Sequence, residues 1–151
     1  MGAVPTMAVD KGTGVCFVDD MSTRIKITYA IYARPDLEAE EVRRLWMDEH
    51  GNMLRRHART LGIVRYVQTL HTPHPSEQGM AEVRGATAEL PFGTAELYWE
   101  SLETYEASVA SREGRQAYRE LLEDERRFAS HVVSSPWLGK EREVDLGWSE
   151  E

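Results

Sequence analysis

Two strand–helix–strand patterns follow one another in this chain, and a long loop separates them. In the first pattern, the β-branched and aromatic run 25–33 ends at Pro35 and predicts a strand, and the run 63–70 predicts the second strand. Between them, apolar residues recur at helical spacing from Val42 to Leu54, and this helix is expected to end near Leu61-Gly62. The two expected strands and the helix between them therefore make one βαβ unit.

The second pattern repeats this order. A strand is expected at 93–99, and Ser101 is placed to cap a helix through roughly Ala110. Ser111 can cap a continuation whose apolar positions extend as far as Val132, and a last strand is expected at 137–144. The sequence thus predicts an α+β fold with the ferredoxin-like order βαββαβ and an antiparallel four-stranded sheet.

The segment 72–93 between the two patterns contains three prolines and three glycines. We interpret it as a long loop that can hold a short helical turn. Loops of this length in a compact domain are usually functional lids or irregular excursions.

The expected sheet has helices on one side only, which leaves its other face to be covered. The first two strands carry large side chains in both registers, with Tyr29 against Tyr32 in one strand and Tyr66 against Val67 in the other. Strands that are apolar on both faces are buried on both faces. We therefore expect a second copy of the sheet as the cover, in a homodimer that forms a dimeric α/β barrel.

Length and composition narrow the class of protein. With 151 residues, one domain over residues 21–151 is expected. The net charge of −8 argues against a nucleic-acid partner, and no apolar run approaches the ~20 residues that a membrane span needs. Cys16 is the single cysteine, so no internal disulfide is possible and a cytoplasmic location is expected.

Residues 1–20 do not share the periodicity of the remainder. They are rich in small residues and lack the pattern of a secretory signal, and Met21 offers a second plausible start before the first strand. We interpret this segment as a flexible extension. An arm that packs on a partner subunit is the alternative.

His50 is the first candidate for chemistry. It lies on the apolar stripe of its helix, because Trp46 precedes it by four residues and Met53 and Leu54 follow it by three and four. An imidazole with an ordinary pKa near ~6.5 can exchange protons at neutral pH. A core histidine that hydrogen-bonds a neighbouring carbonyl is the competing interpretation.

The other histidines do not indicate a metal site. His57 returns to about the same helical face, but at ~1.5 Å per residue it lies ~10 Å further along the axis than His50. His71 and His74 flank a proline in the loop, and no His or Cys cluster has ligand spacing. Glycine-rich phosphate loops are absent as well, so neither a metal nor an organic cofactor is predicted.

Aromatic residues supply the walls of a candidate ligand site. Tyr29, Tyr66, Tyr98 and Trp99 are on expected strands and Trp46 is on the helix, with Arg65 beside Tyr66 on the opposite face. Such walls suit a planar apolar molecule, and a phenol can hold a carbonyl oxygen or donate a proton. Plain core packing is the alternative for each of them.

Two adjacent carboxylates fall in the second long helix. Asp124 and Glu125 lie within its apolar stripe, where a carboxylate either pairs with an arginine such as Arg119 or Arg127 or faces a histidine. The sequence leaves open which of the two points inward.

Three blocks of sequence resemble the EthD-domain family of dimeric α/β-barrel proteins, over about residues 24–145. These blocks are Trp46-x-x-x-His50-Gly51, the run Leu61 to Gln68, and Leu121 to Glu125 followed by Phe128. The resemblance implies a ferredoxin-like protomer, a dimer whose sheets face each other, and a ligand cavity between sheet and helices. It also matches His50 to the family's histidine after the tryptophan.

The wider superfamily includes cofactor-free cyclases, lactone isomerases and monooxygenases, from catabolic operons and polyketide pathways. We therefore expect a cofactor-independent enzyme that uses His50 and Tyr66 for acid–base chemistry on an aromatic or polyketide-like molecule. Cyclisation, isomerisation, dehydration or decarboxylation would each fit. The expected binding residues are Trp46, Tyr29, His57, Arg65, Tyr98, Trp99 and Asp124. A non-catalytic ligand-binding protein and a cofactor-free monooxygenase are the alternatives.

Overall fold

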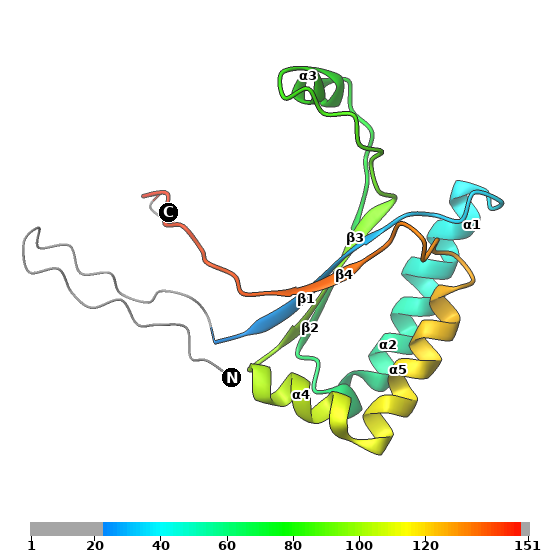
Figure 1. The fold of residues 1–151 in the computed structure, drawn as a ribbon, viewed down its shortest axis with the longest axis vertical. Helices are drawn as coiled ribbons and strands as arrows, with labels where there is room; N and C mark the ends of the chain where they lie inside the picture. The colour runs from blue at the N-terminus through cyan, green and yellow to red at the C-terminus, as the bar shows by residue number, and fades with distance from the viewer. Residues whose placement is uncertain (1–22, 149–151) are drawn as a thin grey trace, which may run out of the picture.

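Four antiparallel strands form one sheet in the order β2-β3-β1-β4 in the computed structural model, which describes residues 23–148 (Figure 1). The elements are β1 Ile25–Ile31, α1 Ala39–Arg43, the π-helix η1 Arg44–His50, α2 Gly51–Leu61, β2 Arg65–Leu70, α3 Ser76–Glu82, β3 Gly93–Trp99, α4 Leu102–Ala110, α5 Arg112–Glu125 and β4 Pro136–Gly139. This confirms the predicted α+β, ferredoxin-like class. The predicted extension 1–20 lies outside the described residues.

The helix-covered face of the sheet is built by alternate residues of the central strands. Tyr29 of β1 lies opposite Ala95 of β3, and Tyr66 of β2 lies opposite Leu97. These side chains pack against η1, α2 and α5, which lie together on one side of the sheet (Figure 1). Every second side chain of the central strands therefore packs against the apolar faces of the helices, and together they form a single core layer.

Gly93 lets the largest core side chain approach the sheet. A Cβ added at Gly93 would lie 2.2 Å from the carbonyl oxygen of Thr69 and 2.6 Å from the Trp46 ring. Trp46 is completely buried against this point. The Trp46 indole can therefore lie in this position only because residue 93 has no side chain.

A π-helical segment carries both Trp46 and His50. The amide of Gly51 donates to the carbonyl oxygen of Trp46, five residues back, and the Gln68 side chain donates to the same oxygen at 3.0 Å. Single π-helical turns within longer helices occur frequently at functional sites. The sequence predicted one continuous helix here, and the wider turn shifts the residues that follow it.

The open face of the sheet is more polar than expected. Lys26 binds Glu96 at 2.8 Å and Glu141 at 2.9 Å, and the Tyr98 hydroxyl donates to Glu141 at 2.6 Å. The prediction of a strand that is apolar on both faces was therefore wrong for β1, whose open face carries Lys26. Tyr29 and Tyr66 both belong to the helix-covered face, and the opposite register of β1 carries Lys26 and Thr28.

The second long helix ends earlier than predicted, at Glu125 rather than near Val132, which is 95% exposed. Beyond Glu125 the backbone pairs with the end of β1 instead. The Arg34 amide donates to Phe128, and the Ser130 amide donates to Tyr32. These bonds pair backbone groups of residues 128–130 with the chain just after β1, so these groups do not need a longer α5 as their partner. Phe128 is fully buried in this segment.

The last strand is also shorter than predicted, at Pro136–Gly139 rather than 137–144. The segment around α3 projects away from the sheet and is joined to β2 and β3 by irregular connections (Figure 1). None of the α3 residues is buried. In the described part of the chain, every helix is too short or too polar to cross a bilayer.

Candidate active site

An apolar cavity of about 410 Å³ lies between the helix-covered face of the sheet and the helices. Its walls are mainly aliphatic and aromatic, and a few polar groups converge on it. The lining residues are Ile27, Tyr29, Ile31, Trp46, His50, Leu54, Tyr66, Ala95, Leu97, Tyr118, Leu121, Leu122, Glu125, His131, Ser134 and Pro136. An apolar pocket with a few convergent polar groups is the usual form of a small-molecule site.

A larger hollow of about 620 Å³ lies elsewhere, beside His57 and between charged residues such as Arg112 and Arg115. It is an open polar groove on the outer side of the helices. We place the candidate site in the smaller cavity, because that cavity is apolar and includes the buried histidine.

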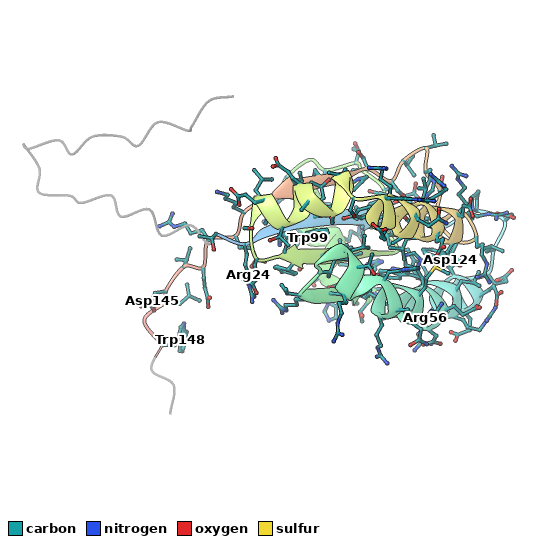
Figure 2. The ribbon with its side chains drawn as sticks, turned by 90° about the horizontal axis from the view of Figure 1, so that it is seen from below. Arg24, Arg56, Trp99, Asp124, Asp145 and Trp148 are labelled. Atoms are coloured by element: carbon teal, nitrogen blue, oxygen red, sulfur yellow. The ribbon has the colours of Figure 1, made fainter. Side chains whose placement is uncertain are left out.

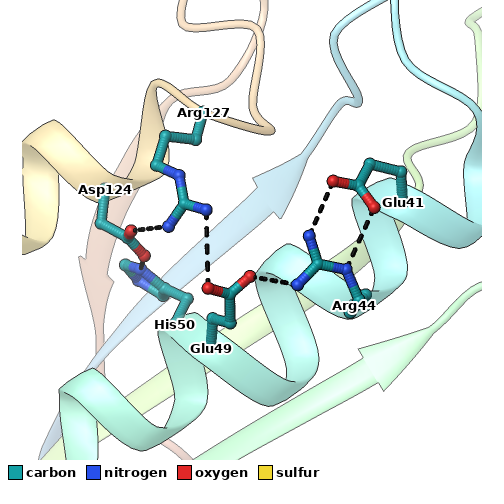
Figure 3. Close-up of polar contacts among 6 residues, drawn as sticks. All are labelled: Glu41, Arg44, Glu49, His50, Asp124 and Arg127. Carbon is teal, nitrogen blue, oxygen red and sulfur yellow. Dashed lines mark hydrogen bonds and ion pairs between the residues drawn. The ribbon is translucent and has the colours of Figure 1, made fainter.

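His50 and Asp124 form a buried pair on the cavity wall. Nδ1 of His50 lies 2.8 Å from Oδ2 of Asp124, and each side chain is less than one-tenth exposed (Figure 3). Since a carboxylate can only accept, Nδ1 carries the hydrogen. The ring also meets Phe128 edge to face at 5.2 Å between centroids. Nδ1 is therefore occupied, and Nε2 is the nitrogen left for a ligand.

A chain of charges holds Asp124 in place from the outside. Its other oxygen, Oδ1, accepts from Arg127 at 2.8 Å, and Arg127 also contacts Glu49 at 3.5 Å (Figure 3). Glu49 in turn binds Arg44 at 2.6 Å. The hydrogen bond to Asp124 is the main cause that raises the pKa of Arg127, so the guanidinium stays charged. The carboxylate that orients His50 is thus itself oriented.

Tyr66 lies on the same cavity wall, with Trp46 beside it. Burial raises the pKa of Tyr66 to about 12, although the side chains of Trp46 and Gln68 act in the opposite direction. The indole Nε1 of Trp46 is buried and makes no hydrogen bond to any described residue. Tyr66 therefore remains a neutral phenol at physiological pH, able to donate a hydrogen bond into the cavity.

Tyr29 and Glu125 form a second polar group of the cavity. Burial raises the pKa of Tyr29, and the nearby Glu125 carboxylate raises it further. His131 approaches Glu125 at 3.7 Å. Of the two adjacent carboxylates in α5, Glu125 thus lines the cavity and Asp124 binds the histidine.

Five of the seven residues predicted for binding do not line this cavity, and one of these five, Asp124, contacts the lining residue His50. His57 pairs with Glu120 at 2.8 Å on the outer side of the helices. Trp99 donates its indole N–H to the carbonyl of Leu61 at 2.7 Å within a second core cluster (Figure 2). On the open face of the sheet, the Arg65 guanidinium stacks over the Tyr98 ring at 5.0 Å. The structure brings together His50, Tyr66, Trp46, Tyr29 and Asp124 from the predicted set.

Several cavity residues were not predicted. Tyr118, Leu121 and Leu122 lie at helical spacing on one face of α5, together with Glu125, for which the sequence left the direction open, so periodicity could have shown that this helix forms a wall. His131 and Ser134 come from the irregular segment after α5, where no sequence pattern places side chains. Among residues 23–148, no cluster of three or more potential metal ligands occurs.

The sheet order and the one-sided helix layer define a ferredoxin-like α+β domain. Residues 34–131 match the model of the EthD domain, and the chain belongs to the EthD domain family. No functionally curated protein matches the chain.

Solved structures show the same fold at low sequence identity. An ethyl tert-butyl ether degradation (EthD) family protein from Bacillus halodurans is 15% identical, with a TM-score of 0.53 over 78% of this chain and 98% of that one. The hydroxynitrile lyase of Passiflora edulis is 10% identical, with a TM-score of 0.51 over 81% and 96%. SnoaB, a cofactor-independent oxygenase from Streptomyces nogalater, gives 0.48 at 12% identity over 82% and 97%.

Proposed function

We propose that this EthD-domain protein is a cofactor-independent enzyme that removes a proton next to the carbonyl group of a small aromatic or polyketide-like molecule. The observation that carries the proposal is the His50–Asp124 pair, with 2.8 Å between Nδ1 and Oδ2, on the wall of an apolar cavity. A histidine that only filled the core would not need a buried carboxylate held by an arginine.

The reaction starts with transfer of the substrate's α-proton to Nε2 of His50. The C–H bond breaks, its electron pair moves toward the carbonyl oxygen, and an enolate forms. The Asp124 carboxylate stabilises the resulting imidazolium through Nδ1, and the Tyr66 phenol donates a hydrogen bond to the enolate oxygen. Each group is placed before the charge develops, so little reorganisation is needed.

The enolate is the shared intermediate of several reactions. Ring closure by aldol addition, isomerisation, dehydration and decarboxylation all use it. The apolar lining supports a planar hydrophobic substrate, because a strongly charged molecule would lose its hydration there without enough partners.

The functional unit in this proposal is a homodimer. The helices cover only one face of the sheet (Figure 1). Trp137 of β4 is 59% exposed, at a position on the other face. A second copy of the same face would bury this tryptophan and place the Lys26–Glu96 pair at an interface.

The test is product analysis by mass spectrometry on a panel of polyketide-like ketones, with wild type and His50→Ala. We expect conversion of at least one ketone by wild type and a rate lower by about 10²–10⁴-fold in His50→Ala. Equal turnover by both proteins would remove His50 from the mechanism. Tight binding of the panel with no conversion would indicate a ligand-binding protein instead of an enzyme.

A further inference from the structure

The polar groups of the cavity form two separate ends. His50 and Tyr66 belong to η1 and β2, whereas Tyr29, Glu125 and Ser134 come from β1 and the segments that precede β4. Strands β2 and β1 flank β3, so with ~4.8 Å between neighbouring strands the backbones at Tyr66 and Tyr29 are at least ~10 Å apart. A ligand that fills the cavity therefore meets a different set of groups at each end.

Glu125 dominates the second end. Its side chain is 17% exposed, and the nearest basic group is His131 at 3.7 Å, beyond normal hydrogen-bond length. The arginine two residues along, Arg127, is bound to Asp124 and Glu49 instead. A carboxylate in an apolar wall is costly unless donors surround it.

Tyr29 supplies only one such donor. Because burial and the neighbouring Glu125 carboxylate raise the pKa of Tyr29, this phenol stays protonated and is available to the carboxylate as one donor. A carboxylate offers about four acceptor positions, so Glu125 retains capacity for a further donor from the cavity side.

We infer that Glu125 recognises a hydroxyl group of the ligand, on the Tyr29 side of the cavity and away from the carbonyl that His50 and Tyr66 engage. The ligand class is then a hydroxylated aromatic ketone, and Glu125 is its specificity residue. The inference rests on the proposed function, which defines the carbonyl end. A neutral hydroxyl fits better than an ammonium group, because the mainly apolar lining, with Ile27, Ile31 and Pro136, would not replace the hydration of a full positive charge.

Three probes of the same skeleton test this by isothermal titration calorimetry at neutral pH, where a phenol is protonated. They are acetophenone, para-methoxyacetophenone and para-hydroxyacetophenone, of which only the last carries a donor at the far end. We expect wild type to bind para-hydroxyacetophenone about 10-fold more tightly than the other two, as for one hydrogen bond to a charged group.

Substitutions in α5 test whether Glu125 causes the preference for the hydroxyl probe. In Glu125→Gln and in Glu125→Met we expect the affinity ratio between hydroxyl and methoxy probes to fall below about 3-fold. Glu123→Gln, which removes the same charge from the exposed side of α5, should keep the wild-type ratio.

The outcomes separate this inference from the proposed function. If wild type binds all three probes with equal affinity, the cavity is a ligand site but Glu125 does not read a hydroxyl group. If the preference survives in Glu125→Gln and Glu125→Met, another residue provides it and the inference is wrong. If no probe binds to wild type, both this inference and the assignment of the cavity fail.

Discussion

Nδ1 of His50 donates a hydrogen bond of 2.8 Å to Asp124, although 74 residues separate the two in the chain. The bond joins the end of η1 to the end of α5, the two helical segments that wall the cavity. It selects the tautomer with a free Nε2, which is the form that a general base requires. The geometry of this pair connects the fold to the proposed chemistry.

Replacement of Asp124 by asparagine should separate catalysis from folding. An amide can present its NH₂ group to Nδ1, which favours the tautomer with hydrogen on Nε2 and so blocks the base. We expect a loss of activity of about 10²-fold or more with a folded protein by circular dichroism. Nitrogen NMR of the His50 ring should show the change of tautomer. A fully active Asp124→Asn would contradict the role of the pair.

Gly93→Ala should destabilise the protein and disturb the site together. The added methyl would lie 2.2 Å from the Thr69 oxygen and 2.6 Å from the Trp46 ring, so the indole must move. We expect a loss of about 2 kcal/mol or more in the free energy of unfolding in urea. Gly79→Ala is the control, because nothing lies within 4 Å of the added carbon there, and it should not lower the stability.

The buried tyrosines predict a stability change at alkaline pH. The pKa of Tyr66 is raised by burial to about 12, against ~10 in the unfolded chain, so the folded state favours the neutral phenol. This contribution to stability is fully present below pH ~10 and is lost as the pH rises from there toward 12. Absorbance titration of phenolate should show late-ionising tyrosines, one fewer in Tyr66→Phe. Ionisation of all six near pH 10 would show that Tyr66 is not buried in solution.

A homodimer should have twice the chain mass of 17.2 kDa by light scattering. Interfaces between permanently associated copies usually bury ~2,000 Å² or more, so dilution to micromolar concentration should not dissociate it. Trp137→Glu should give the monomer mass, because it would place a charge in the apolar contact that this exposed tryptophan of the edge strand β4 makes with the second copy. A monomer in wild type would exclude the barrel arrangement.

Period and spacing were enough to predict the fold. The alternation in 25–33 identifies a strand, and the helical spacing of apolar residues around His50 identifies a helix. The same signals recur in the second half of the chain, and the resulting element order is the ferredoxin-like one. The same approach did not predict the polar face of the sheet, because the network of Lys26, Glu96 and Glu141 joins three distant segments.

The site was predictable only where a regular element carries it. His50, Tyr66 and Trp46 follow from helix and strand patterns, and the structure places them on one cavity. Whether Asp124 or Glu125 meets the histidine depends on how α5 is rotated against η1, which a single amphipathic stripe does not determine to one residue. Tyr98 and Trp99 were assigned by residue type alone, and they lie outside the cavity.

Deuterium incorporation from heavy water into the α-carbon of a bound ketone is the most direct test of His50 as a base. NMR detects this exchange whatever reaction follows the enolate, and acetophenone and para-hydroxyacetophenone are suitable probes. The account predicts that wild type exchanges the methyl protons of at least one of them and that His50→Gln is slower by about 10²-fold or more at saturating ketone. Exchange at the same rate in His50→Gln, or no exchange by wild type above the rate in buffer, would contradict it.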